Sequence, residues 1–116
     1  RNFRELTIWT KGMEIVNLTY DILEHLPDTE KFELRSQCGR AAVSIPSNIA
    51  EGCARKSQKH FVQFLETALG STFELQTQVL IIRNRFDCPQ TQIETLLSLL
   101  EEESKMLTSF INKVNS

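Results

Sequence analysis

The sequence of 116 residues contains little cysteine, proline or glycine, with three, three and four residues respectively. The odd number of cysteines, with no CxxC pair, excludes a disulfide framework and predicts free thiols in a reducing cytosol. So few glycines and prolines exclude collagen-like and low-complexity chains. The longest unbroken apolar run, residues 79–82, is far shorter than the ~20 residues that span a bilayer, so we expect a cytoplasmic protein with no membrane partner.

Net charge and enzyme signatures are also scarce. The formal charge of −2 gives no overall attraction toward nucleic acid or anionic lipid, so such attraction would have to come from a local patch. The sequence has no Gly-rich phosphate loop, no HExxH motif and no Glu-x-x-His pair of the di-iron type. We therefore expect no catalytic activity, no cofactor and no metal.

Apolar residues recur at spacings of three and four along four segments of the chain. The pattern predicts helices over residues 4–26, 30–52 and 57–86, and a fourth from about residue 91 onward. Short links between them predict an all-α fold, an antiparallel up-down-up-down four-helix bundle in one domain of residues 1–116. Pro46 predicts a kink in the second helix, Gly52 its end, and Ser57 the N-cap of the third.

The first predicted helix carries three apolar columns, two of which alternate at spacings of three and four residues and are together called the longer column. Three columns in seven are typical of a helix that faces a bundle core, so we expect the longer column and the isoleucine column beside it to face the core. The longer column comprises Leu6, Trp9, Met13, Val16, Tyr20 and Leu23, and the isoleucines are Ile8, Ile15 and Ile22.

The third predicted helix has a second apolar stripe, nearly opposite the core line that includes Leu75 and Val79. This stripe comprises Val62, Leu69, Phe73 and Leu80. A helix that is apolar on two faces is buried on two faces, so the stripe predicts a subunit interface. The alternative interpretation is a set of scattered exposed apolar residues, which are common on protein surfaces.

Basic residues concentrate in the middle of the chain. Residues 31–60 hold six Lys and Arg, Lys31 among them, against two Asp and Glu. Arg55, Lys56 and Lys59 gather at the predicted link between the second and third helices, and Arg40 is a further cation of this segment. Repeated in an oligomer, these residues would attract phosphates in a salt-dependent way. The alternative interpretation is a solvated turn.

A set of polar residues lies beside the core line of the third helix. Ser71, Glu74 and Gln78 are spaced by three and four residues, which places them on one flank. Glu74 alone would suit a catalytic carboxylate. The stronger interpretation is a structural network in which Arg40 pairs with Glu74, because a partly buried carboxylate needs a cation.

Two motifs carry a resemblance to a known family. They are SIPSNIAEG at residues 44–52 and, further on, GS..EL.TQ at residues 70–78. The chain resembles the four-helix-bundle family encoded in intervening sequences of bacterial 23S rRNA genes. The opening FRELTIWTKG, residues 3–12, is also similar, although Gly12 stands where alanine is common in that family.

The resemblance implies a homo-oligomer, with a ring of five bundles as its typical form. The fold is also similar to that of the accessory proteins of diversity-generating retroelements, which bind a reverse transcriptase and nucleic acid. Two hypotheses for function follow. In the first, the chain is a non-catalytic oligomeric scaffold that associates with RNA or with a nucleic-acid-processing protein. In the second, it is a purely protein-binding or structural oligomer.

Overall fold

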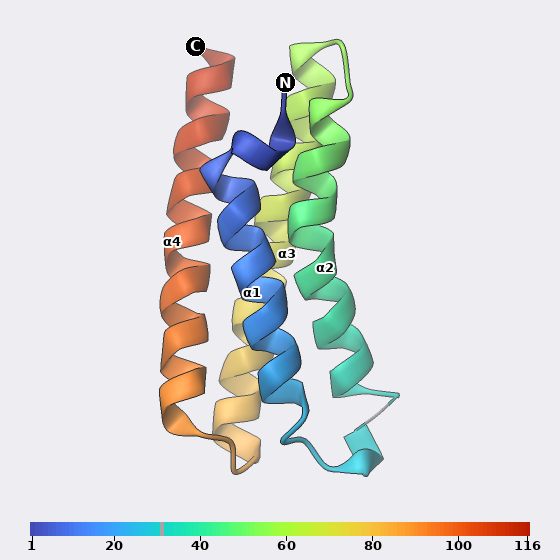
Figure 1. Cartoon of the computed structure of the whole chain (residues 1–116), viewed down its shortest axis with the longest axis vertical. Helices are drawn as coiled ribbons and strands as arrows, with labels where there is room; N and C mark the ends of the chain where they lie inside the picture. Colours follow the sequence, from blue (N-terminus) through green and yellow to red (C-terminus); the bar gives the residue numbers. More distant parts are fainter. Residues whose placement is uncertain (31) are drawn as a thin grey trace.

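The computed structural model describes residues 1–30 and 32–116, and this part of the chain holds four α-helices, two short 3-10 turns and no strand. The helices are α1 (Thr7–Leu23), α2 (Leu34–Cys53), α3 (Gln58–Arg85) and α4 (Gln90–Asn115), and the turns are η1 (Phe3–Glu5) and η2 (Asp28–Glu30). Successive helices run in opposite directions (Figure 1), so the chain forms a four-helix bundle that measures 44 × 24 × 20 Å.

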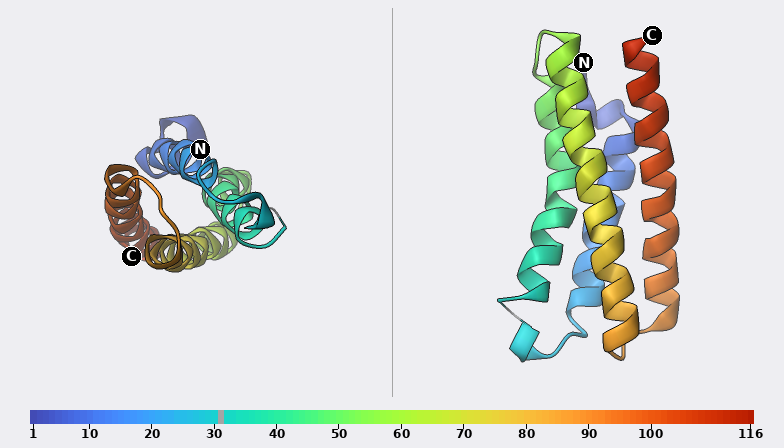
Figure 2. Two further views of the ribbon diagram at one scale, coloured as in Figure 1. Left: turned by 90° about the horizontal axis from the view of Figure 1, so that it is seen from below. Right: turned by 180° about the vertical axis from the view of Figure 1, so that it is seen from behind.

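Seen along the long axis, the four helices stand at the corners of a square in chain order (Figure 2, left). α1 and α3 each contact α2 and α4, so the α1/α2 face and the α3/α4 face lie on opposite sides of the bundle. We call the end that holds the α2–α3 link the link end; the first and last residues of the chain lie there too (Figure 1). No helix of the described residues is long and apolar enough to cross a membrane.

The helix ends follow from local hydrogen bonds. The prediction of Ser57 as N-cap is confirmed, because its hydroxyl accepts from the backbone N–H of His60 at 3.0 Å. The first helix begins later than expected, at Thr7, since residues 3–5 form a 3-10 turn that Asn2 caps. It ends at Leu23, and Arg35 holds that end by donating to two carbonyl oxygens, those of Leu23 at 3.2 Å and Leu26 at 2.6 Å.

The core of the bundle confirms the predicted line of α3 and corrects that of α1. Leu65 and Leu75 of α3 are fully buried, as expected. In α1, however, Ile15 is fully buried, whereas Met13 and Tyr20 of the longer column are 38% and 49% exposed. Gly12 and Thr19 flank the isoleucines inside the bundle. Small residues on that side let α1 approach its neighbours closely, so the isoleucine column became the inner one.

Pro46 and Gly52 both lie inside α2. The helix continues on either side of Pro46, where Asn48 donates to the carbonyl oxygen of Ser44 at 2.8 Å, and the kink itself stays a prediction. Gly52 has no positive φ, so it does not end the helix as a left-handed residue. A Cβ at Gly52 would lie 2.8 Å from Cβ of Phe64. Its role is therefore the close approach of α2 to the start of α3.

Candidate functional site

Three of the predicted phosphate-binding residues lie together at the link end. Arg55 and Lys56 stand in the link between α2 and α3, and Lys59 follows in the first turn of α3. All three are exposed. The first residues of the chain reach the same end, where Arg1 and Arg4 add two cations (Figure 1). We call these five residues the basic end.

The arginines of the basic end lie over aromatic rings. The guanidinium carbon of Arg1 is 3.9 Å from the ring centroid of Phe61, and that of Arg55 is 4.8 Å from the centroid of Phe64. Arg4 lies 5.2 Å from the ring of Phe3, its neighbour in sequence. A guanidinium stacked on a ring loses side-chain freedom but keeps N–H donors at its edge. The rings therefore restrict these guanidinium groups and leave N–H donors at their edges.

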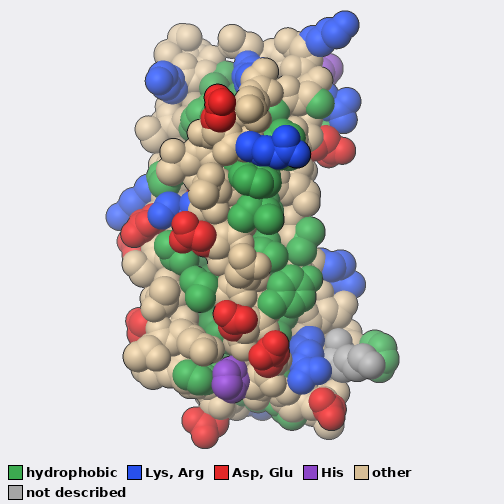
Figure 3. Space-filling model, viewed as in Figure 1, with side chains coloured by type: hydrophobic (Ala, Val, Ile, Leu, Met, Phe, Trp, Pro, Cys, Tyr) green, Lys and Arg blue, Asp and Glu red, His purple; other side chains and the backbone are tan. Residues whose placement is uncertain are grey.

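Charge is divided between the two ends of the bundle. The half nearer the link end comprises residues 1–14, 45–70 and 103–116, which carry eight Lys and Arg against five Asp and Glu, a net charge of +3. The remaining described residues carry four Lys and Arg against ten Asp and Glu, a net charge of −6. In Figure 3 most of the basic side chains on the visible face lie over its upper half, whereas the acidic side chains are spread over both halves. The net charge of the whole chain, −2, therefore does not reveal that one end of the bundle is positively charged.

Arg40 is separate from the basic end. It precedes Arg55 by fifteen residues, which in a helix corresponds to roughly 22 Å. Its guanidinium donates to the hydroxyl of Ser36 at 2.8 Å. Arg40 therefore does not belong to the phosphate site in which the sequence placed it. Lys31, which contributed to the basic count of residues 31–60, lies outside the described residues.

The predicted polar network forms only in part. Ser71 bonds to Ser44 at 2.8 Å between α3 and α2, and Gln78 is buried, although its Oε1 has no partner among the described residues. The expected ion pair between Arg40 and Glu74 is absent from these residues. Glu74 is exposed, so water solvates its carboxylate and no buried cation is needed.

The predicted interface stripe of α3 divides into inner and outer residues. Val62 is only 7% exposed and belongs to the core of its own bundle, and Leu69 is half-buried against that core. Phe73 and Leu80 are 52% and 39% exposed. With Leu97 and Glu101 of α4 they border a shallow depression on the α3/α4 face. We call these four residues the α3/α4 patch.

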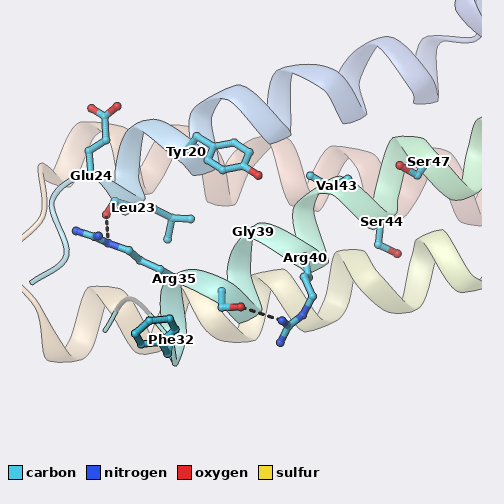
Figure 4. A pocket seen from close by; sticks show the side chains of 11 residues that line it. Tyr20, Leu23, Glu24, Phe32, Arg35, Gly39, Arg40, Val43, Ser44 and Ser47 are labelled. Carbon is cyan, nitrogen blue, oxygen red and sulfur yellow. Dashed lines mark hydrogen bonds between the residues drawn. The ribbon is translucent and has the colours of Figure 1, made fainter. Parts of the chain in front are cut away.

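A larger open groove, of about 920 Å³, runs between α1 and α2 near the end opposite the link end. Figure 4 shows Tyr20 of α1 facing Gly39 and Val43 of α2 across it, with Arg35 and Arg40 along the α2 side. We call this the α1/α2 groove. Sequence reasoning missed it because its signal, the longer apolar column of α1, was assigned to the core.

Thiol and metal chemistry have little support in the described residues. Desolvation raises the pKa of the buried Cys38 thiol to about 12, so this thiol stays protonated at neutral pH. Burial also raises the pKa values of Cys53 and Cys88. Within residues 1–30 and 32–116, no group of three or more His, Cys, Asp or Glu side chains is placed to hold a metal ion.

The fold and its surfaces define a class: a small four-helix bundle with a basic end and two exposed apolar surfaces. A family model described as 23S rRNA-intervening sequence protein matches residues 4–109, so the chain belongs to that family. A crystal structure of a protein of unknown function from the S23 ribosomal protein family of Bacteroides thetaiotaomicron is similar, with 25% identity and a TM-score of 0.80 over 90% of this chain and 98% of that chain. No curated protein matches the chain.

Proposed function

We propose that this chain is a non-catalytic, self-associating bundle whose basic end binds the phosphates of RNA. The observation that carries the proposal is the basic end itself, where five exposed or stacked cations gather on a chain of net charge −2. Phosphate contacts position a protein on RNA without reading its sequence. The binding proposed here is therefore electrostatic and tolerant of base changes.

Self-association increases the affinity of this weak site for RNA. One basic end offers only a few phosphate contacts, whereas several ends in one assembly raise the effective concentration of each for the same RNA. The resemblance to the intervening-sequence family implies a ring of five copies. The exposed Phe73 and Leu80 support self-association independently, because aligned large apolar side chains on a soluble bundle mark an interaction surface.

Fluorescence anisotropy with a labelled structured RNA tests the proposal. We expect the affinity to fall steeply between ~50 and ~200 mM salt. The variant Lys56→Ala/Lys59→Ala should bind more weakly and show a smaller salt slope, by roughly 0.7–0.9 for each phosphate contact removed. Arg83→Ala/Arg85→Ala is the matched control, because it removes the same charge from the last turn of α3 at the opposite end.

The alternative function is a purely protein-binding or structural oligomer with no nucleic-acid role. The α1/α2 groove favours this alternative, since its apolar residues suit a protein surface better than a phosphate backbone. An oligomer that binds no RNA at low salt would support this alternative function. So would an unchanged affinity in the Lys56→Ala/Lys59→Ala variant.

A further inference from the structure

The start of α3 brings a guanidinium group, an imidazole and an aromatic ring together at the link end (Figure 1). The guanidinium carbon of Arg55 lies 4.8 Å from the ring centroid of Phe64. His60 precedes Phe64 by four residues, so their side chains lie on one face of the helix, one turn apart. We call Arg55, His60 and Phe64 the α3 cluster.

The packing of α2 against α3 holds the ring of the α3 cluster in place. A Cβ on Gly52 would lie 2.8 Å from Cβ of Phe64, which shows how closely α2 approaches this side chain. Phe64 is half-buried, whereas Arg55, which lies over it, is exposed. One face of the guanidinium therefore lies against the ring, and the opposite face is open to solvent. The cluster thus presents a flat surface on a rigid support.

The polar groups of the α3 cluster have no partner in the part of the chain that the structure describes. Neither the guanidinium of Arg55 nor the imidazole of His60 takes part in a hydrogen bond or an ion pair there. Arginines at the opposite end differ, since Arg35 donates to two carbonyl oxygens and Arg83 lies 3.5 Å from Glu94. The cluster therefore keeps its donors and its open face for a ligand.

The flat shape of the guanidinium suits an unpaired RNA base. Such a base stacks on an arginine or on an aromatic side chain, histidine included, whereas the bases of a duplex are already stacked on their neighbours. Lys56 follows Arg55 and Lys59 precedes His60, and both lysines are exposed. A lysine ammonium group binds a phosphate as a point charge. The residues therefore fit single-stranded RNA, with a base for the cluster and phosphates for the lysines.

We infer that the α3 cluster stacks an unpaired base of RNA on the open face of Arg55, beside His60, while Lys56 and Lys59 bind the adjacent phosphates. The inference rests on the proposed function and narrows its ligand to RNA with unpaired bases. Every base has a face that can stack, so binding remains tolerant of sequence. What the cluster distinguishes is a single strand from a duplex.

Fluorescence anisotropy with three labelled RNAs tests the inference. They are a single strand, the same strand annealed to its complement, and the same strand with an abasic ribose at every position. Phosphate contacts alone favour the duplex, because its charge density is higher. We expect the opposite order, with the single strand bound most tightly. The abasic strand should bind roughly 5- to 150-fold more weakly than the single strand, which is the range for one stacked base.

Variants that keep the charge separate stacking from electrostatics. Arg55→Lys retains the positive charge and removes the flat group, so the affinity for the single strand should fall roughly 5-fold or more while the affinity for the duplex stays the same. Arg85→Lys, in the last turn of α3 at the opposite end, is the matched control and should change neither affinity. Phe64→Leu removes the ring under Arg55 and should also weaken the single strand selectively. Circular dichroism checks its fold, and His60→Ala, at an exposed position, replaces it if it unfolds.

The outcomes distinguish this inference from the proposed function. A wild type that binds none of the three RNAs at ~50 mM salt would overturn the proposed function and the inference with it. Binding of the duplex or the abasic strand as tightly as the single strand would overturn the stacked base alone. An Arg55→Lys variant that keeps the wild-type affinity for the single strand would do the same. Lys56→Ala/Lys59→Ala should weaken single strand and duplex alike, and a loss confined to one of them would overturn the assignment of phosphates to these lysines.

Discussion

The carboxyl group of Glu103, on α4, lies directly over the backbone of Gly12, on α1. A Cβ on Gly12 would be 3.4 Å from Oε2 of Glu103, so the carboxyl packs closely against this part of α1. Glu103 is fully buried and neither oxygen has a hydrogen-bond partner among the described residues. Desolvation raises the pKa of this carboxyl from 4.5 to about 8, against the opposing charge of Lys11. The core of the bundle therefore holds a protonated glutamic acid at neutral pH.

This buried acid makes stability depend on pH. Because the folded pKa is raised, the contribution of Glu103 is fully present below pH 4.5 and is lost as the pH rises through about 8. Between these values Glu103 alone lowers the free energy of unfolding by about 1.4 kcal/mol per pH unit. We expect Glu103→Gln to remove this dependence and to be more stable than the wild type at pH 9.

Denaturant unfolding at pH 5, 7 and 9, at constant protein concentration, provides the measurement. The gap between the Glu103→Gln variant and the wild type should widen as the pH increases. Glu102→Gln, the exposed neighbour that pairs with Lys11 at 2.6 Å, is the control and should show a much smaller pH effect. Parallel pH profiles for wild type and Glu103→Gln would contradict a raised pKa.

Replacing each of two helical glycines with alanine should change the free energy of unfolding in opposite directions. Gly70 lies in α3, and a Cβ at this position would have no neighbouring atom within 4 Å, so Gly70→Ala should stabilise the bundle by about 0.5–1 kcal/mol through helix propensity. Gly52→Ala places its methyl 2.8 Å from Cβ of Phe64, which forces α2 and α3 apart and should destabilise by about 1–3 kcal/mol. Thermal and urea unfolding measure both. Equal effects of the same sign would show that Gly52 has no packing role.

Arg35 should stabilise the fold as the cap of α1. Its two bonds to the carbonyl oxygens of Leu23 and Leu26 satisfy groups that the end of a helix leaves free. We expect Arg35→Met to cost about 1.5–3 kcal/mol in the free energy of unfolding, since a charged donor is lost. Arg85→Met is the comparison, and its loss should stay below about 1 kcal/mol. Hydrogen exchange should quicken in the last turn of α1 in Arg35→Met alone; unchanged exchange there would refute the capping role.

The spacing of apolar residues in the sequence predicted most of the fold. The four segments, the Ser57 cap and the core line of α3 all follow from local spacing and hydrogen-bonding groups, and the motifs around Pro46 pointed to the family. The basic link between α2 and α3 was also visible in the sequence. These features depend on residues close together in the chain, which is why one-dimensional patterns reveal them.

Packing between helices determined which helix faces are buried, which the spacing of residues along the chain does not determine. Both apolar columns of α1 have helical spacing, and only packing against α2 and α4 selects Ile15 for the core and leaves Tyr20 outside. Arg40 and Arg55 share one basic segment, yet the length of α2 keeps them apart. Glu103 falls on the apolar spacing between Leu100 and Leu107, and only the structure shows that its carboxyl group is buried next to Gly12. The order of residues alone establishes which segments are helices and where charges cluster along the chain, whereas contacts between distant helices establish which faces are buried, because burial is a property of pairs of elements.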